Sequence, residues 1–276
     1  MPIDPALGGV PETALWTLHH RAREAARPDT VLPDPMALRL VAALDYPFEQ
    51  RFGHGFPAQA QTLALRARAF DDEIRAFLDR RPDGTVVALG EGFETTFWRV
   101  DNGRVHWLTV DLPETAALRR ELLPHGDRQR VVAGSAFDLS WADSVDPARG
   151  VLVTAQGLLM YFPPAQSEAL LAGVAARFPG GGMVFDTITS FVNRQVLRQL
   201  RGGGNFLPPP LQWFVDPGDL QRLRDLDPAI ATVREVRPRA GRGLAGWLAP
   251  RLRYVPYVGR RRPCVVALTF AGTPDA

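Results

Sequence analysis

The sequence predicts an α/β fold with a seven-stranded, mostly parallel sheet and helices on both of its faces. Two observations support this prediction. Short apolar runs recur from residue 85 to residue 270, and such runs are typical of strands that are buried on both faces. Helical patterns separate the first five runs, which is the alternation that a parallel sheet requires. We expect the last two strands to form an antiparallel hairpin.

Residues 1–80 are predicted to form a helical cap that precedes the sheet. Prolines divide this stretch into helices at about 11–26, 35–45 and 59–80. The third helix carries an apolar stripe that includes Phe70 and Ile74, and Arg66 lies close to it. Because these helices precede the first strand, we expect them to cover the ligand site of the sheet.

Residues 81–276 are predicted to form the core domain. Its third strand is expected at 130–136. Two long connections interrupt the regular alternation, at about 189–230 and 238–262. The first connection is rich in glycine and aromatic residues, and insertions of this length often carry function, so we expect it to be a substrate-binding lid. The strands begin near residues 85, 105, 130, 150, 182, 232 and 264.

The most informative stretch joins the first two strands. The first strand ends in Gly90-Glu91-Gly92, and the second ends in Asp111, about twenty residues after the glycines. Glycine lets a backbone approach a ligand closely, and a carboxylate at this spacing can accept two hydrogen bonds from a ribose diol. The stretch therefore predicts a nucleoside-cofactor site at the carboxyl ends of the strands in a Rossmann-like sheet.

The residues around the glycine turn favour one nucleoside cofactor over another. A dinucleotide fingerprint would place a third small residue where this chain has Thr95. Glu91 and Glu94 put negative charge beside the turn, which disfavours a pyrophosphate and favours the sulfonium and amino group of S-adenosylmethionine. We therefore expect S-adenosylmethionine, and an NAD-dependent oxidoreductase is the alternative.

Composition narrows the range of partners. All 32 basic residues are arginine, yet the formal net charge is only +2. Nine arginines and one acid lie between Arg234 and Arg262; we interpret this stretch as a solvated face and expect no nucleic-acid partner. A single cysteine, Cys264, excludes an internal disulfide and disfavours a structural metal site. No signal peptide or membrane span is recognisable, so we expect a cytoplasmic protein.

Several motifs in order resemble one enzyme family. The segments VVALGEGFETTFWRV and WLTVDLPE resemble the leucine carboxyl methyltransferase family. The segments TALWTLHHRAREAARPD, LRARAFDDEI and VTAQGLLMYF resemble its bacterial branch, which is similar to the tetracenomycin polyketide O-methyltransferase. The resemblance covers about residues 11–200. It implies S-adenosylmethionine-dependent methylation of an oxygen, usually a carboxylate.

The resemblance also implies a set of cofactor contacts. Arg66 matches an arginine that holds the methionine carboxylate, and Asp111 matches the acid that binds ribose. Ser135 and Ala136 fall where adenine contacts lie, and Gln156 replaces a glutamate of eukaryotic members. The complete set of expected cofactor residues is Arg21, Arg66, Gly90, Glu91, Gly92, Asp111, Leu112, Ser135, Ala136, Phe137 and Gln156.

The reaction places few demands on the protein. Methyl transfer is an in-line displacement, and a carboxylate acceptor is already ionised at neutral pH. A phenol acceptor would benefit from a base, for which His19 and His20 are candidates. We expect a carboxylate on a small, polyketide-like metabolite; the alternative is a non-catalytic cofactor-binding partner in a biosynthetic complex. Four residues could orient the acceptor: Tyr161, Arg194, Tyr254 and Tyr257.

Overall fold

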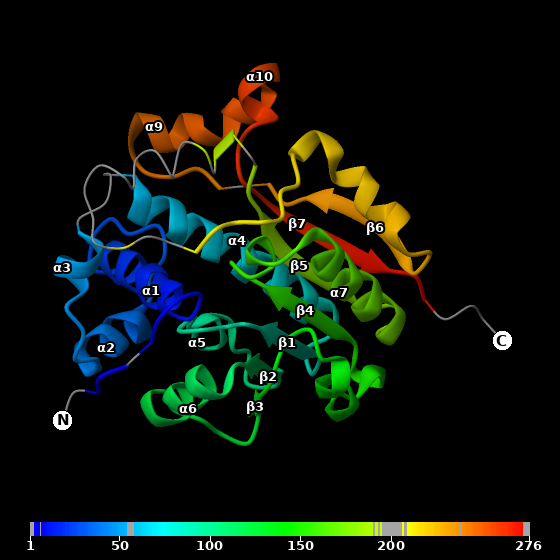
Figure 1. Cartoon of the computed structure of the whole chain (residues 1–276), viewed down its shortest axis with the longest axis horizontal. Coiled ribbons are helices and arrows are strands. Elements are labelled where there is room, and N and C mark those ends of the chain that lie inside the picture. The colour runs from blue at the N-terminus through cyan, green and yellow to red at the C-terminus, as the bar shows by residue number, and fades with distance from the viewer. Residues whose placement is uncertain are drawn as a thin grey trace.

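The computed structural model confirms the predicted sheet (Figure 1). Its strand order is β3-β2-β1-β4-β5-β7-β6; β1 to β5 are parallel, and β7 lies antiparallel between β5 and β6. The strands are β1 (Thr85–Leu89), β2 (His106–Asp111), β3 (Gln129–Ala133), β4 (Val151–Ala155), β5 (Gly182–Thr187), β6 (Ile230–Glu235) and β7 (Cys264–Phe270). The structure describes residues 3–5, 7–53, 58–189, 191–192, 194, 206, 209–237 and 239–272.

Burial on both faces explains why the central strands are apolar throughout. Every residue of β1 and of β4 is buried, whereas β3 lies at the sheet edge and is partly exposed. The predicted third strand is too long, because β3 ends at Ala133. The next residue, Gly134, leaves the ladder after its N–H donates to the carbonyl of Asp111.

Helices cover both faces of the sheet. On one face, Phe70 and Ile74 of α4 (Gln59–Arg80) pack with α5 (Thr96–Val100) against Val86 and Val184. On the other face, Leu171 packs against the apolar side chains of β1 and β4. The elements of that face are α7 (Pro164–Arg177), η1 (Leu139–Ser144) and η4 (Pro217–Leu226), while α6 (Pro113–Leu122) contacts β2 and β3.

Three short helices form the cap: α1 (Glu12–Ala25), α2 (Pro35–Ala43) and α3 (Phe48–Phe52). They share an apolar cluster that also includes Phe93, next to the glycine turn. The predicted cap ran to residue 80, but α4 is divided between two partners. Its first half contacts Val31 and Leu32 beside the cap, and its second half lies on the sheet.

The first long connection, at 189–230, contacts both the cap and the core where it is described. Phe206 packs edge-on against Phe52, with ring centroids 5.0 Å apart. The backbone N–H of Gln212 then donates to the carbonyl of Met160, and Trp213 is buried in the core instead of belonging to a lid. The sequence also predicts a basic helix at 191–200; residues 193 and 195–200 of it, and the glycines at 202–204, lie outside the described residues.

The remaining short helices lie in connections. They are η2 (Pro147–Arg149), η3 (Leu159–Tyr161), α9 (Gly243–Leu248), η5 (Ala249–Tyr254) and α10 (Pro256–Gly259). In Figure 1, α9 and α10 project from the top of the molecule. Over the described residues, no helix combines the length and apolar character that a membrane span requires.

Candidate cofactor site

The parallel pairing of β1 with β2 and β4 brings their carboxyl ends to one edge of the sheet. The turn after β1 follows a left-handed path, with φ of +57° at Gly90 and +55° at Gly92. A Cβ would lie 2.7 Å from Leu158 at the first position and 2.7 Å from Ala14 at the second. The glycines are therefore required by the backbone path and by close packing of the protein itself, in addition to any approach of a ligand.

Asp111 is fixed at this edge by the turn. Its Oδ2 accepts a hydrogen bond from the backbone N–H of Gly92 at 2.7 Å, and its Oδ1 accepts one from Leu112 at 2.9 Å. Burial raises the pKa of Asp111, and the Gly92 N–H opposes that shift. Each oxygen keeps a lone pair for a further donor, so the carboxylate is held in a suitable plane to accept a ribose diol.

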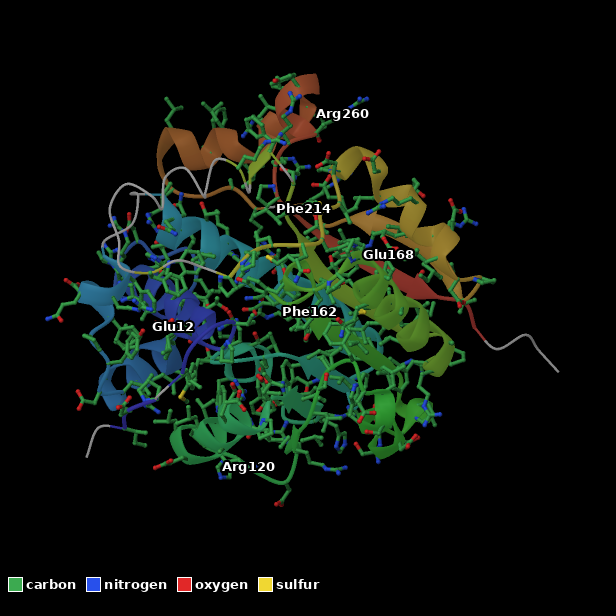
Figure 2. All side chains as sticks on the ribbon, in the orientation of Figure 1. Glu12, Arg120, Phe162, Glu168, Phe214 and Arg260 are labelled. Atoms are coloured by element: carbon green, nitrogen blue, oxygen red, sulfur yellow. The ribbon has the colours of Figure 1, made fainter. Side chains whose placement is uncertain are left out.

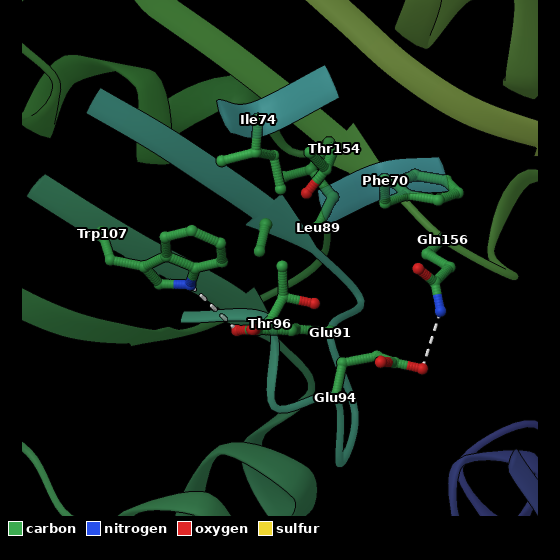
Figure 3. Close-up of a pocket in the computed structure, with 10 residues that line it drawn as sticks. Phe70, Ile74, Leu89, Glu91, Glu94, Thr96, Trp107, Thr154 and Gln156 are labelled. Atoms are coloured by element: carbon green, nitrogen blue, oxygen red, sulfur yellow. Dashed lines mark hydrogen bonds between the residues drawn. The ribbon is translucent and has the colours of Figure 1, made fainter. Parts of the chain in front are cut away.

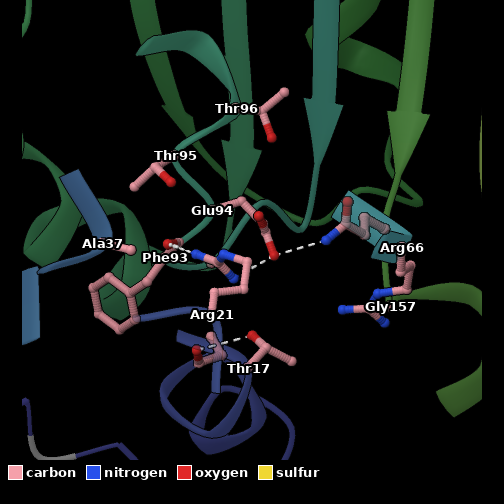
Figure 4. Close-up of polar contacts among 12 residues, drawn as sticks. Thr17, Arg21, Ala37, Arg66, Phe93, Glu94, Thr95, Thr96 and Gly157 are labelled. Atoms are coloured by element: carbon pink, nitrogen blue, oxygen red, sulfur yellow. Dashed lines mark hydrogen bonds and ion pairs between the residues drawn. The ribbon is translucent and has the colours of Figure 1, made fainter. Parts of the chain in front are cut away.

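Glu94 lies at the centre of the site and joins the cap to the sheet (Figure 4). It forms a buried ion pair with Arg21 of α1, whose Nη2 also donates to the carbonyl of Phe93 at 2.7 Å. On its other side, Gln156 donates to Glu94 Oε1 at 2.7 Å from the end of β4. The sequence predicts only a negative charge at Glu94, although its position directly after the glycine turn indicates that it belongs to the site.

Arg66 lies across from Arg21, on the other side of Glu94 (Figure 4). Its Nη1 donates to Asp186 Oδ2 at 3.1 Å, and the backbone N–H of Gly157 donates to Asp186 Oδ1 at 2.6 Å. Gly157 has a φ of +67°, and a Cβ there would lie 3.2 Å from Arg66. Asp186 thus pairs with an arginine, as a buried carboxylate in a strand requires. The partly exposed guanidinium of Arg66 stays at the carboxyl ends of β4 and β5.

Glu91 is a predicted cofactor contact, but its side chain is turned toward the interior of the protein. Its carboxylate lies beneath the turn, where Oε2 accepts hydrogen bonds from Arg119 at 2.8 Å and from Thr109. Trp107 is a third donor to the same oxygen (Figure 3). Burial raises the pKa of Glu91, against the effect of Arg119. The carboxylate lies there because Arg119 of α6 is buried beneath the turn and pairs with it.

A small cavity also lies beneath the turn, between α4 and the sheet (Figure 3). Its volume is about 10 Å³, and Phe70, Glu91 and Gln156 are among the residues that line it. Pockets for small-molecule ligands usually have volumes of several hundred Å³. This cavity is therefore too small to hold the cofactor, although Glu94 and Gln156 of the site line it.

Thr95 shows why the third position of a dinucleotide fingerprint is not glycine here. Its hydroxyl donates to Asp34, the residue that caps the N-terminus of α2. Arg99 on α5 donates to Asp34 at 2.8 Å and to both oxygens of Asp71 at 2.8 and 2.9 Å. This buried network connects the cap, α4 and the turn, so Thr95 has a structural role.

The buried charges around the turn carry a surplus of acid. Such a surplus disfavours an anionic pyrophosphate and suits a ligand with a net positive charge. The arginines are Arg21, Arg66, Arg99 and Arg119, and the carboxylates are Asp34, Asp71, Glu91, Glu94, Asp111 and Asp186.

The other predicted cofactor residues follow β2 and β3 at the same edge. Leu112 is exposed beside Asp111. Ser135 accepts a hydrogen bond from the backbone N–H of Phe137, whereas Ala136 is buried. The ring of Phe137 contacts the ring of Phe162, in the connection that follows β4, with centroids 4.4 Å apart. These residues lie where an adenine beyond the ribose acid would reach.

Tyr161 lies on η3, close to Arg66. Thr13 of α1, whose hydroxyl donates to the carbonyl of Val10 at 2.6 Å, lies close to its phenol, and Asp186 lies near enough to affect its charge. Burial raises the pKa of Tyr161, so the hydroxyl stays protonated near neutral pH and can donate a hydrogen bond.

The other three predicted acceptor-orienting residues lie at the surface. Arg194, Tyr254 and Tyr257 all have exposed side chains. The two tyrosines belong to short helices that project from the molecule, and Arg261 lies over the ring of Tyr257 at 3.4 Å. Their contact with the acceptor stays a prediction.

The histidines of α1 supply no strong base. His20 is fully buried, and burial, with smaller effects of His19 and Arg23, lowers its pKa to about 3. His19 is also buried, with its ring stacked on Phe48 at 5.6 Å between centroids. An imidazole with such a low pKa is a weak proton acceptor at neutral pH.

Comparisons with known proteins agree with this geometry. Residues 14–175 match the family model for leucine carboxyl methyltransferase. The chain is 31% identical over 259 residues to the tetracenomycin polyketide synthesis O-methyltransferase TcmP of Streptomyces glaucescens, covering 90% of this chain and 94% of that protein. It is 28% identical to the S-adenosyl-L-methionine-dependent methyltransferase dpfgK of Gibberella zeae, covering 64% of each chain.

One solved structure shares the fold over almost the whole chain. It is a DUF574 family protein from Streptomyces avermitilis, with a TM-score of 0.58 and 12% identity. The match covers 92% of this chain and 96% of that one.

Proposed function

The chain belongs to the leucine carboxyl methyltransferase family and is an S-adenosylmethionine-dependent O-methyltransferase, and we propose that it methylates a carboxylate oxygen of a small, polyketide-like metabolite. One observation carries the choice of acceptor. A protonated phenol that can donate to the acceptor, Tyr161, lies at the carboxyl edge, while His20 is too weak a base to activate a phenol at neutral pH. An ionised carboxylate needs donors and no base.

The residues at the edge fit the cofactor. Asp111 would accept the ribose diol, and Arg66 would hold the methionine carboxylate. Glu94 would face the ammonium group: its Oε2 is buried and accepts no hydrogen bond within the described part of the chain, although Arg99 Nη2 lies 3.8 Å from it. When bound, S-adenosylmethionine supplies a methyl group activated by its sulfonium.

The protein contributes to the reaction through position. The acceptor oxygen has to lie in line with the methyl carbon and the sulfur, and such orientation accounts for much of the acceleration of a displacement. Tyr161 would donate its hydrogen bond to the second oxygen of the acceptor carboxylate and leave the first free to attack. The surplus acid at the turn would stabilise the sulfonium until the charge is lost in the transfer.

The arginine-rich stretch supports a small acceptor over nucleic acid, because many of its charges are used within the molecule. Four ion pairs join it to acids of the same chain: Arg234 with Glu73, Arg239 with Asp72, Arg242 with Glu24, and Arg262 with Glu235.

The experiment that tests the proposal is a transfer assay with methyl-labelled S-adenosylmethionine. Aromatic carboxylic acids and matched phenols of the same ring size serve as acceptors, and the rate is followed from pH 6 to pH 9. We expect methyl esters from the acids, with no rise in rate through the ordinary titration range of a histidine. Methylation of phenols alone, with a rate that rises with pH, would show that the acceptor class is wrong.

A further inference from the structure

One surface of the protein is explained neither by the sheet nor by the cofactor site. Large apolar side chains are exposed on the consecutive elements α9, η5 and α10, with exposed fractions of 73% for Leu244, 49% for Trp247 and 66% for Tyr257. Over the described residues, only Leu38 and Leu112 are exposed large apolar residues elsewhere. We call this surface the α9–α10 face: Leu244, Trp247, Leu248, Tyr254, Val255, Tyr257 and Val258.

Cations border the face, and acids are absent from its sequence. Residues 236–262 contain eight arginines and neither aspartate nor glutamate; three of the arginines, Arg239, Arg242 and Arg262, pair with acids outside this stretch. The guanidinium of Arg251 lies 3.7 Å from the ring centroid of Trp247, and that of Arg261 lies 3.4 Å from that of Tyr257. The aromatic rings are therefore held at the surface beside positive charge.

The face lies at the same end of the sheet as the cofactor site. Both β5 and β6 are antiparallel to β7, so β6 leaves the sheet at the carboxyl edge and the chain re-enters there. The base of the face is tied to that edge, because Thr189, just after β5, donates to the carbonyl of Arg261 at 3.0 Å. Figure 2 shows Arg260 at the outer margin of the projection.

We propose that the α9–α10 face docks on the surface of an anionic lipid bilayer. Tryptophan and tyrosine favour the headgroup region, leucine and valine favour the acyl boundary, and arginines bind lipid phosphates. An apolar surface that projects from the protein can insert between lipid headgroups, because a bilayer adapts to its shape. A second copy of the chain is a poorer occupant, because pairing the face with itself would bring two sets of arginines together without acids.

The test is co-sedimentation with phosphatidylcholine vesicles, with and without phosphatidylglycerol. We expect the full chain to bind the anionic vesicles and to be released by salt, since lipid–arginine attraction is screened. Leu244→Ser combined with Trp247→Ser should lower the partition coefficient about tenfold or more, through lost apolar burial. Arg251→Glu should lower it by about fivefold or more.

Two matched variants control for general effects. Leu38→Ser changes an exposed leucine on α2, and Arg104→Glu changes an exposed arginine of the β1–β2 connection; both should bind as the native chain does. Circular dichroism of every variant checks that the fold is retained. This test uses neither cofactor nor acceptor, so its outcome is independent of the proposed function.

Two results would overturn the proposal. One is a native chain that sediments with neither kind of vesicle. The other is a dimer in sedimentation velocity that Trp247→Ser dissociates, which would assign the face to a second copy of the chain.

Discussion

Arg99→Leu tests the buried network that holds the cofactor turn against the cap. The Arg99 side chain is 5% exposed and donates to Asp71 at 2.8 and 2.9 Å and to Asp34 at 2.8 Å. Asp34 and Asp71 are buried and share this cation, so the substitution leaves both carboxylates without it. Breaking a buried pair in this way costs about 3–5 kcal/mol, a large share of the roughly 5–15 kcal/mol that stabilises a typical domain.

Urea unfolding, followed by tryptophan fluorescence and circular dichroism, measures this loss. The matched control is Arg104→Leu, because Arg104 pairs with Asp83 at 3.9 Å and both side chains are more than half exposed. Exposed pairs contribute about 0–1 kcal/mol, so the control should unfold at nearly the native urea concentration. Equal unfolding midpoints for the two variants would refute the structural role of the network.

The same variant has an expected pH signature. Burial alone would raise the pKa of Asp34, but Arg99 and Arg21 outweigh it and hold the pKa below its ordinary value. A carboxylate with a lowered folded-state pKa stabilises the protein above its unfolded-state pKa, and this contribution is lost as pH falls through the folded-state pKa. Without Arg99, the acid-unfolding midpoint should move to higher pH.

Three further variants test other parts of the site. Gly92→Ala should destabilise the fold by about 1–3 kcal/mol in urea, because its φ is +55° and the added Cβ would lie 2.7 Å from α1, whereas Gly134→Ala, with open space, should be nearly neutral. Tyr161→Phe should lower kcat by about tenfold without changing cofactor affinity, measured by steady-state kinetics and calorimetry; equal loss of both would remove its acceptor role. Asp186→Asn should weaken S-adenosylmethionine binding about tenfold in calorimetry, since the amide would turn a donor toward Arg66; unchanged affinity would contradict this.

The sheet could be predicted because its strands satisfy one simple rule. Val86 and Val87 are both buried, on opposite faces of the sheet. The strand is therefore apolar at every position, whereas a strand with one exposed face would alternate apolar and polar residues. The helix at 59–80 was also readable from its stripe. The division of this helix between the cap and the sheet could not be predicted, because the same amphipathic pattern fits either partner.

The site was predicted in position but not in the direction of its side chains. The position of Asp111 follows from the number of residues between the glycine turn and the end of the second strand, and this number can be counted in the sequence. Glu91 and Glu94 look equivalent as neighbours of the same turn, yet one lies beneath it with Arg119 and the other faces the edge with Arg21. That difference depends on which helix delivers an arginine to each side, and this is set by tertiary packing. The exposure of Tyr257 depends on tertiary packing in the same way.

The central claim is that S-adenosylmethionine binds at Asp111. Isothermal titration calorimetry with S-adenosylmethionine, its demethylated product and NAD tests it most directly, on the native chain, on Asp111→Asn and on the exposed control Asp127→Asn. We expect the first two ligands to bind and NAD not to bind, and we expect Asp111→Asn alone to weaken binding by about tenfold, or about 1.4 kcal/mol. Binding of NAD in their place, or equal affinity in all three proteins, would contradict it.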